Sequence, residues 1–177
     1  MSEKNIKPII LLSGPVGAGK TTVAQEMVKL ATEPTVWIEG DKFWFFIAKG
    51  FNAIGRSKNF RIIMTSMIAA SLPYAINGYG VILDFSIPPW FLDTARKIAG
   101  AREVPLDYVV LRPDENICAE RAANRTEGII KDYSAYHNLY VSFDEAGQNI
   151  IYDNFSEAAA IANTVMKGLM EELFRIS

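Results

Sequence analysis

A chain of 177 residues, of which 50% are hydrophobic and 21% charged, predicts one globular domain over residues 1–177, built around a single core. The net charge of -2 provides no general attraction for polyanions, so a nucleic-acid partner is not expected. Cys118 is the only cysteine, which excludes an internal disulfide and a cysteine-rich zinc site and fits a reducing compartment. A monomer and a homodimer are both compatible with these features.

The apolar segments predict a protein that does not cross a membrane. The N-terminal residues lack the pattern of a signal peptide, and we therefore expect a cytoplasmic protein. No charged residue occurs between Arg61 and Asp84, but Pro73 and Gly78 interrupt this interval before it reaches the about 20 residues of a bilayer span. The interval predicts a buried helix followed by a buried strand.

A glycine-rich loop follows the first predicted strand, residues 9–13, and precedes the first predicted helix, residues 21–31. The loop matches the phosphate-binding pattern G-x-x-x-x-G-K-T, in which glycines turn backbone N–H groups toward phosphate oxygens. Lys20 is expected to reach the β- and γ-phosphates, and Thr21 to place its hydroxyl on Mg²⁺. The expected ATP contacts are Gly14, Pro15, Val16, Gly17, Ala18, Gly19, Lys20, Thr21 and Thr22.

The second predicted strand, residues 35–39, ends in the acidic segment Glu39-Gly40-Asp41. In phosphoryl transfer to an alcohol, an aspartate near the acceptor takes the hydroxyl proton, and we assign Asp41 this role of catalytic base. An alternative is that Asp41 caps a helix over residues 42–49. Glu39 is a weaker candidate, for holding Mg²⁺ through water.

The third predicted strand, residues 80–84, ends in Asp84. A carboxylate at the end of a buried strand is the usual setting of a second group that organises Mg²⁺ in nucleoside triphosphate enzymes. The sequence leaves three roles open for Asp84: it binds the metal, orients the acceptor, or caps the loop that follows.

A predicted helix over residues 114–125 follows the fourth predicted strand, residues 106–111, and carries Arg121 and Arg125 on one face. By charge alone the two arginines would form a solvated face paired with nearby glutamates. Because the helix leaves the strand next to the phosphate loop and enters a polar segment, we expect a lid over residues 121–140 that closes on the nucleotide. His137 in that segment is expected to be an exposed polar residue.

Short strands alternate with helices along the whole chain, which predicts an α/β protein. The remaining elements are a strand at residues 149–153 and helices at residues 57–77, 89–100 and 157–175. This order implies a parallel sheet with helices on both faces and with ligands at the carboxyl ends of the strands.

These motifs together resemble the P-loop kinase group of adenylate, shikimate and gluconate kinases, to which chloramphenicol phosphotransferase and zeta toxins also belong. The resemblance implies a three-layer α/β/α P-loop NTPase fold, with a five-stranded parallel sheet of order 2-3-1-4-5 and a small lid. It also implies that Arg121 lies against the adenine and that Arg125 meets the transferred phosphate. The glycine triplet that helps to bind shikimate is absent after the third strand, so shikimate is not an expected acceptor.

The acceptor site is predicted at residues 41–61 and 84–91, because these segments follow the second and third strands. They are rich in aromatic residues, half or more of which are expected in the core, and they contain several cations. The expected acceptor contacts are Asp41, Phe45, Arg56, Arg61 and Asp84.

The predicted function is an ATP- and Mg²⁺-dependent phosphotransferase that moves the γ-phosphate to a hydroxyl of an antibiotic, sugar, nucleoside or sugar nucleotide. Its catalytic residues are Lys20, Asp41 and Arg125. One alternative is a nucleotide-binding switch, but the D-x-x-G element at residues 144–147 comes too late in the chain, and no N-K-x-D motif occurs. A second is a polynucleotide 5′-hydroxyl kinase, whose basic channel is not indicated by 18 basic against 20 acidic residues.

Overall fold

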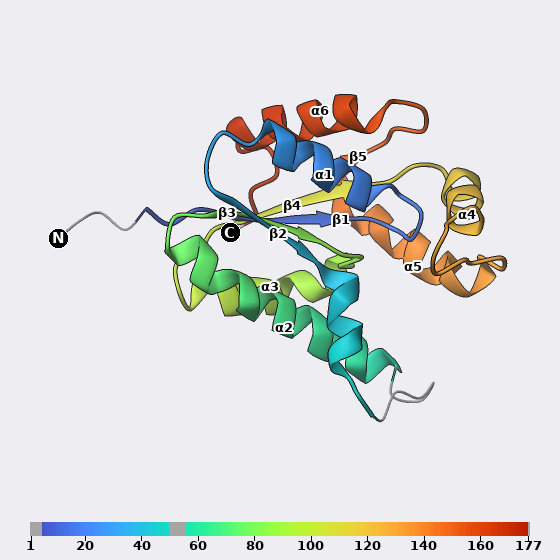
Figure 1. The fold of residues 1–177 in the computed structure, drawn as a ribbon, viewed down its shortest axis with the longest axis horizontal. Helices are drawn as coiled ribbons and strands as arrows, with labels where there is room; N and C mark the ends of the chain where they lie inside the picture. Colours follow the sequence, from blue (N-terminus) through green and yellow to red (C-terminus); the bar gives the residue numbers. More distant parts are fainter. Residues whose placement is uncertain (1–4, 50–55, 177) are drawn as a thin grey trace.

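A computed structural model describes residues 5–49 and 56–176 of the chain, without the side chain of Arg56. The described residues form a central sheet between two layers of helices (Figure 1). Helices α1 (Lys20–Leu30) and α6 (Ala158–Met170) cover one face, and α2 (Arg56–Ile76) and α3 (Leu92–Gly100) cover the other.

The sheet contains β1 (Ile9–Ser13), β2 (Thr35–Glu39), β3 (Gly80–Asp84), β4 (Leu106–Leu111) and β5 (Ile150–Ile151). The five strands run parallel in the order β2-β3-β1-β4-β5, which confirms the predicted fold class and strand order. In the centre, Leu11 pairs with Leu83 on one side and with Tyr108 on the other. The carboxyl ends of β1, β3 and β4 therefore meet at one edge, where the phosphate loop begins.

Each face of the sheet has its own apolar core, as expected for strands that are buried on both sides. On the α2 and α3 face, Leu11, Leu83 and Val110 pack with Met64 and Met67. On the α1 and α6 face, Leu12, Val109 and Val23 pack with Ile161 and Val165. The alternation of side chains along β1 and β4 thus supplies both cores from the same strands.

The uncharged interval forms α2 and β3, as the sequence predicts. Pro73 lies inside α2, near its C-terminal end, and is exposed. Within the described ranges no helix combines the length and the apolar character needed to cross a membrane.

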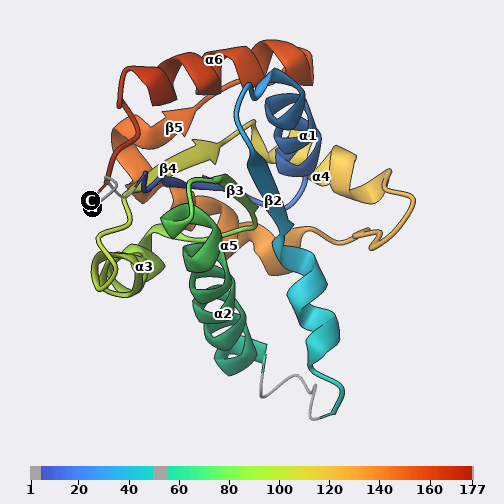
Figure 2. The ribbon, with the colours of Figure 1, turned by 60° about the vertical axis from the view of Figure 1, so that its left-hand side comes forward.

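Short helices connect the layers, namely η1 (Gly40–Phe46), η2 (Pro89–Phe91), η3 (Ser134–Tyr136) and η4 (Phe143–Asn149), together with α4 (Glu115–Ala123) and α5 (His137–Ser142). Figure 2 shows η1 and the first turns of α2 projecting together beyond the sheet. The predicted helix at residues 42–49 is wrong in type, since the segment forms a 3₁₀ helix that begins and ends earlier.

The region after α4 contains more structure than the sequence predicts. Its polar residues suggest a loop, but Tyr133, Tyr140 and Phe143 are buried and hold η3, α5 and η4 against the body. Tyr133, Tyr136 and Tyr140 have the spacing of one helical face, which is the signal that could have identified these elements.

Candidate active site

The phosphate loop lies directly on the backbone of two neighbouring elements. Gly14 and Gly17 have φ angles of 136° and 84°, in the region that side chains disfavour. A Cβ atom at Gly14 would collide with the carbonyl oxygen of Leu111, and one at Gly17 with the carbonyl oxygen of Cys118. These glycines therefore let the loop sit against the end of β4 and the middle of α4.

Lys20 is the first residue of α1 and is buried among oxygen atoms. Its ammonium donates to the carbonyl oxygens of Gly14 at 3.2 Å and Pro15 at 3.0 Å, and to the hydroxyl oxygen of Ser86 at 3.1 Å. Burial lowers the pKa of Lys20, and the nearby carboxylates of Asp84 and Asp41 oppose this shift. The ammonium is thus the centre around which the charged groups of the site gather.

Asp84 is 5% exposed at the end of β3. Burial raises the pKa of its carboxyl group, whereas the Lys20 charge and a hydrogen bond with Thr21 lower it. A carboxylate and a hydroxyl next to each other at the start of α1 are the hard oxygen donors that Mg²⁺ prefers, so these two residues fit the expected metal. The register pairs Asp84 with Glu39, which brings the ends of β2 and β3 together.

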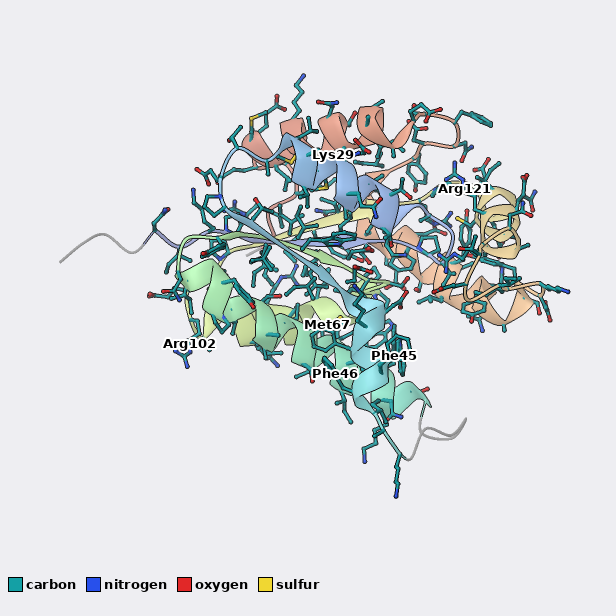
Figure 3. The ribbon with its side chains drawn as sticks, viewed as in Figure 1. Lys29, Phe45, Phe46, Met67, Arg102 and Arg121 are labelled. Carbon is teal, nitrogen blue, oxygen red and sulfur yellow. The ribbon has the colours of Figure 1, made fainter. Side chains whose placement is uncertain are left out.

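Asp41 lies in the first turn of η1 and is exposed. The alternative role as a helix cap is wrong, because η1 begins at Gly40 with Glu39 in the capping position and has no side-chain cap. The Glu39 carboxylate instead accepts from the Lys42 ammonium at 2.6 Å. A Cβ atom at Gly40 would lie only 2.5 Å from the sulfur of Met67, so η1 begins in close contact with α2 (Figure 3).

A cavity of about 610 Å³ joins the phosphate loop, the segment after β2 and the segment after α4. The loop contributes Val16, the segment after β2 contributes Asp41, and the segment after α4 contributes Arg125. The other lining residues are mostly apolar: Trp44, Ser57, Phe60, Phe85, Ser86, Ile130, Ala135, Tyr136 and Leu139. Asp41 and Arg125 therefore line the same cavity, although more than 80 positions separate them in the sequence.

Of the predicted acceptor residues, Asp41 lines this cavity, whereas Phe45, Arg61 and Asp84 do not. Phe45 is 82% exposed on η1 (Figure 3), and the guanidinium of Arg61 lies 4.3 Å from the centroid of the Trp90 ring. In a 3₁₀ helix, residues three apart share a face, so Phe43 packs against Phe46 while Trp44 turns elsewhere. Arg56, the remaining prediction, has a side chain outside the described part of the chain.

The two arginines of the predicted lid do not form the glutamate pairs of the alternative reading. Arg121 donates to the backbone oxygen of Asn154 at 3.1 Å, and a Cβ atom at Gly19 would be 4.0 Å from its Nη1. Arg121, labelled in Figure 3, thus lies beside the start of α1. The charge of Arg125 contributes to lowering the pKa of Lys20. Among the described residues, neither arginine has a carboxylate within ion-pair distance.

Two functional contacts were missed by sequence reasoning. Ser86 lines the cavity and accepts a hydrogen bond from Lys20, and its place two residues after Asp84 at a strand end is the available signal. Tyr133 bonds through its hydroxyl to the backbone of Val16, a contact that no local pattern predicts. His137 is exposed, as expected, and its Nδ1 lies 2.8 Å from the Glu115 carboxylate.

Comparisons with known proteins identify the fold. The family model described as an AAA domain matches residues 9–132. No curated protein sequence matches the chain. The structure is similar to that of a sugar kinase from Janibacter sp. HTCC2649, with a TM-score of 0.69 and 16% identity over 93% of this chain and 95% of that one.

Two further solved structures share the architecture. A gluconokinase from Sinorhizobium meliloti 1021 has a TM-score of 0.65 and 19% identity, over 95% of this chain and 94% of that one. The Deinococcus radiodurans tunicamycin resistance protein has a TM-score of 0.69 and 16% identity, over 97% of this chain and 99% of that one. The phosphate loop and the sheet order agree with this likeness. The chain belongs to the AAA domain family and has the fold of the P-loop small-molecule kinases.

Proposed function

We propose that this protein is an ATP- and Mg²⁺-dependent phosphotransferase that moves the γ-phosphate to a hydroxyl of a small molecule. The observation that carries the proposal is the shared cavity of Val16, Asp41 and Arg125. A carboxylate in a cavity that opens on a phosphate loop is what transfer to an alcohol requires, whereas hydrolysis by a switch protein needs no acceptor space. The relatives described as a sugar kinase and a gluconokinase support this class of acceptor.

The nucleotide binds along the start of α1. The backbone N–H groups of the loop and the N-terminus of the helix hold the phosphates, and the Lys20 ammonium reaches them from its cluster of oxygens. Arg121 lies against the adenine, beside the loop of Tyr152 and Phe155, which are 69% and 86% exposed. The lid over residues 121–140 covers the phosphates and excludes water from the transfer.

Thr21 and Asp84 would hold the metal, since their oxygens adjoin each other at the start of α1. Bound Mg²⁺ neutralises phosphate charge at the β- and γ-positions. Asp84 therefore serves the metal rather than the acceptor.

Transfer begins when Asp41 accepts a hydrogen bond from the acceptor hydroxyl. As the acceptor oxygen forms its bond to the γ-phosphorus, the bond from that phosphorus to the β,γ-bridging oxygen breaks, and ADP leaves with the electron pair. The hydroxyl proton passes to the Asp41 carboxylate. Lys20 and Arg125 counter the negative charge that develops on the transferred group.

Acceptor-dependent ADP release tests the proposal. With ATP and Mg²⁺, the wild-type protein is screened against sugars, nucleosides, sugar nucleotides and hydroxylated antibiotics. Asp41→Asn should reduce transfer by about 100-fold or more while ATP binding is retained, as expected for loss of a positioned base. The matched control is Asp93→Asn, because Asp93 is an exposed carboxylate that pairs with Arg96 on α3. Full activity in the Asp41 variant, or acceptor-independent hydrolysis alone, would contradict the proposal.

A further inference from the structure

One wall of the cavity is a continuous aromatic surface. Trp44 comes from η1, Phe60 from α2 and Phe85 from the end of β3. The Trp44 and Phe60 rings are nearly parallel, at 8° with centroids 6.4 Å apart, and the Phe60 and Phe85 centroids are 5.5 Å apart. Side chains from η1, from α2 and from the residue after β3 thus form one apolar wall of the cavity, in which the Phe60 and Phe85 rings are tilted by 44°.

The lid side of the cavity is also apolar. Ile130, Tyr136 and Leu139 line it from the segment that follows α4. With an aromatic wall on one side and these residues on another, a cavity of about 610 Å³ has the size and lining of a site for a ligand that buries rings. A small polyol would leave most of this apolar surface in contact with water.

The charges of the cavity are few. Among the lining residues that the structure describes, Asp41 is the only anion and Arg125 the only cation. The charge of Arg125 acts on Lys20, so this guanidinium belongs to the phosphate side. Arg61, a further cation of α2, stacks over Trp90 and is not among the lining residues.

We propose, on the basis of the phosphotransferase function above, that the acceptor is an uncharged alcohol that carries a flat ring. The ring stacks on the wall of Trp44 and Phe60, and the hydroxyl reaches Asp41. A carboxylate or phosphate on the acceptor would meet the Asp41 charge with no described cation on the acceptor side to balance it. A cationic acceptor would pair with Asp41 and occupy the carboxylate that must take the proton.

Calorimetric titration with three matched glycosides tests this specificity. Phenyl β-D-glucopyranoside, methyl β-D-glucopyranoside and phenyl β-D-glucuronide are titrated into the full chain saturated with Mg²⁺ and a non-hydrolysable ATP analogue. The phenyl glucoside should bind at least about tenfold more tightly than the methyl glucoside, which lacks the ring, and than the glucuronide, which adds a carboxylate. Equal affinities, tighter binding of the glucuronide, or no measurable binding of the phenyl glucoside would overturn the proposal.

Substitutions in the aromatic wall test whether this wall causes the preference for the phenyl glycoside. Trp44→Leu should reduce the ratio of phenyl to methyl affinity to near one. Phe46→Leu is the matched control, because Phe46 lies on the same helix but is 75% exposed and should leave the ratio unchanged. Phe60→Leu is the second variant if Trp44→Leu does not give a native circular dichroism spectrum, and an unchanged ratio in the folded variant would count against the wall.

Failure of the two proposals can be told apart. If the ring preference is found but no acceptor in the panel stimulates ADP release, the phosphotransferase function is wrong and the ligand class stands. If ADP release is fastest with a charged or aliphatic acceptor, the function stands and the inferred acceptor class is wrong.

Discussion

The side-chain hydroxyl of Tyr133 donates a hydrogen bond of 2.6 Å to the backbone carbonyl oxygen of Val16, and so joins the segment after α4 to the phosphate loop. Burial raises the pKa of Tyr133, which keeps the phenol protonated and able to donate at neutral pH. Val16 belongs to the phosphate loop and also lines the cavity. Through its bond with Tyr133 it therefore connects the proposed lid to the proposed acceptor site.

Tyr133→Phe should lower the free energy of unfolding by about 1 kcal/mol, since it removes one buried hydrogen bond and leaves the ring in place. Urea unfolding followed by circular dichroism measures the change. Limited proteolysis should cut faster within residues 121–140 of the variant. Tyr79→Phe is the control, because Tyr79 is 42% exposed and its ring packs against that of Tyr74. Equal stability of the Tyr133 variant and the wild type would show that the contact does not hold the segment.

Lys20→Ala should reduce phosphoryl transfer by at least about 100-fold, because the ammonium that meets the phosphates is lost. It should also abolish the increase in melting temperature that MgATP gives to the wild type. Lys29→Ala provides the comparison, since Lys29 lies on the same helix, is 68% exposed and pairs with Glu26. The assignment of Lys20 would be refuted by a folded variant that retains both activity and the MgATP effect.

Asp84→Asn should stabilise the ligand-free protein at neutral pH while removing the metal-dependent effect of ATP. The pKa of Asp84 is raised by burial above its ordinary value of 3.8, so the native state holds this proton more tightly than the unfolded state. The stability of the wild type therefore falls as pH rises from about 4 through the raised pKa. The loss of the Lys20 attraction opposes the gain, but burial is the larger effect.

Melting temperatures of the Asp84 variant and the wild type at pH 4, 6 and 8 measure this difference. The variant should gain most at pH 8 and least at pH 4, where the charged form of the wild-type carboxyl is least populated. Asp93→Asn, at an exposed position, should show no such trend. A variant that is less stable at every pH would mean that the carboxylate is held by its partners more strongly than burial opposes it.

Cys118 should be almost inert toward iodoacetamide in the native protein. Its side chain is buried, and burial raises the pKa of the thiol to about 11, so that only about one thousandth is thiolate at pH 8. Mass spectrometry should detect complete labelling in urea and very slow labelling without it. Because the backbone of Cys118 supports Gly17, rapid native labelling would instead reveal that α4 separates from the phosphate loop.

The strands of the central sheet were predictable because each is a run of apolar residues bounded by turn residues. β1, β2, β3 and β4 have the predicted bounds. The predicted strand at residues 149–153 contains only two strand residues, Ile150 and Ile151. Before its start, the Asn149 side chain donates to the backbone oxygens of Tyr108 and Phe174. These hydrogen bonds join residues that are distant in the sequence, so no local sequence pattern predicts them.

The position of the glycine-rich loop between β1 and α1 was predictable from its motif, whereas the aromatic wall of the cavity was predictable only as a region. Whether Trp44 or Phe45 faces the cavity depends on the winding of η1, and a 3₁₀ helix distributes neighbouring side chains differently from an α-helix. The Phe60 and Phe85 rings come into contact only through the packing of α2 against the sheet. The acid after the second strand and the arginine after the fourth come together through the strand order, which the resemblance supplied.

The strand order also places the elements that line the site in two groups, one on each side of β1. β2 and β3 lie on one side of β1, where β2 leads to η1 and α2, and β3 leads to η2 and α3. β4 and β5 lie on the other side, where β4 leads to α4 and β5 to the loop of Asn154. Two of the three wall residues, Trp44 and Phe60, therefore lie between β2 and β3 in the sequence, whereas the phosphate loop lies between β1 and α1. Under the proposed function, substitutions at these two positions should change the acceptor preference and leave the residues of the phosphate loop as they are.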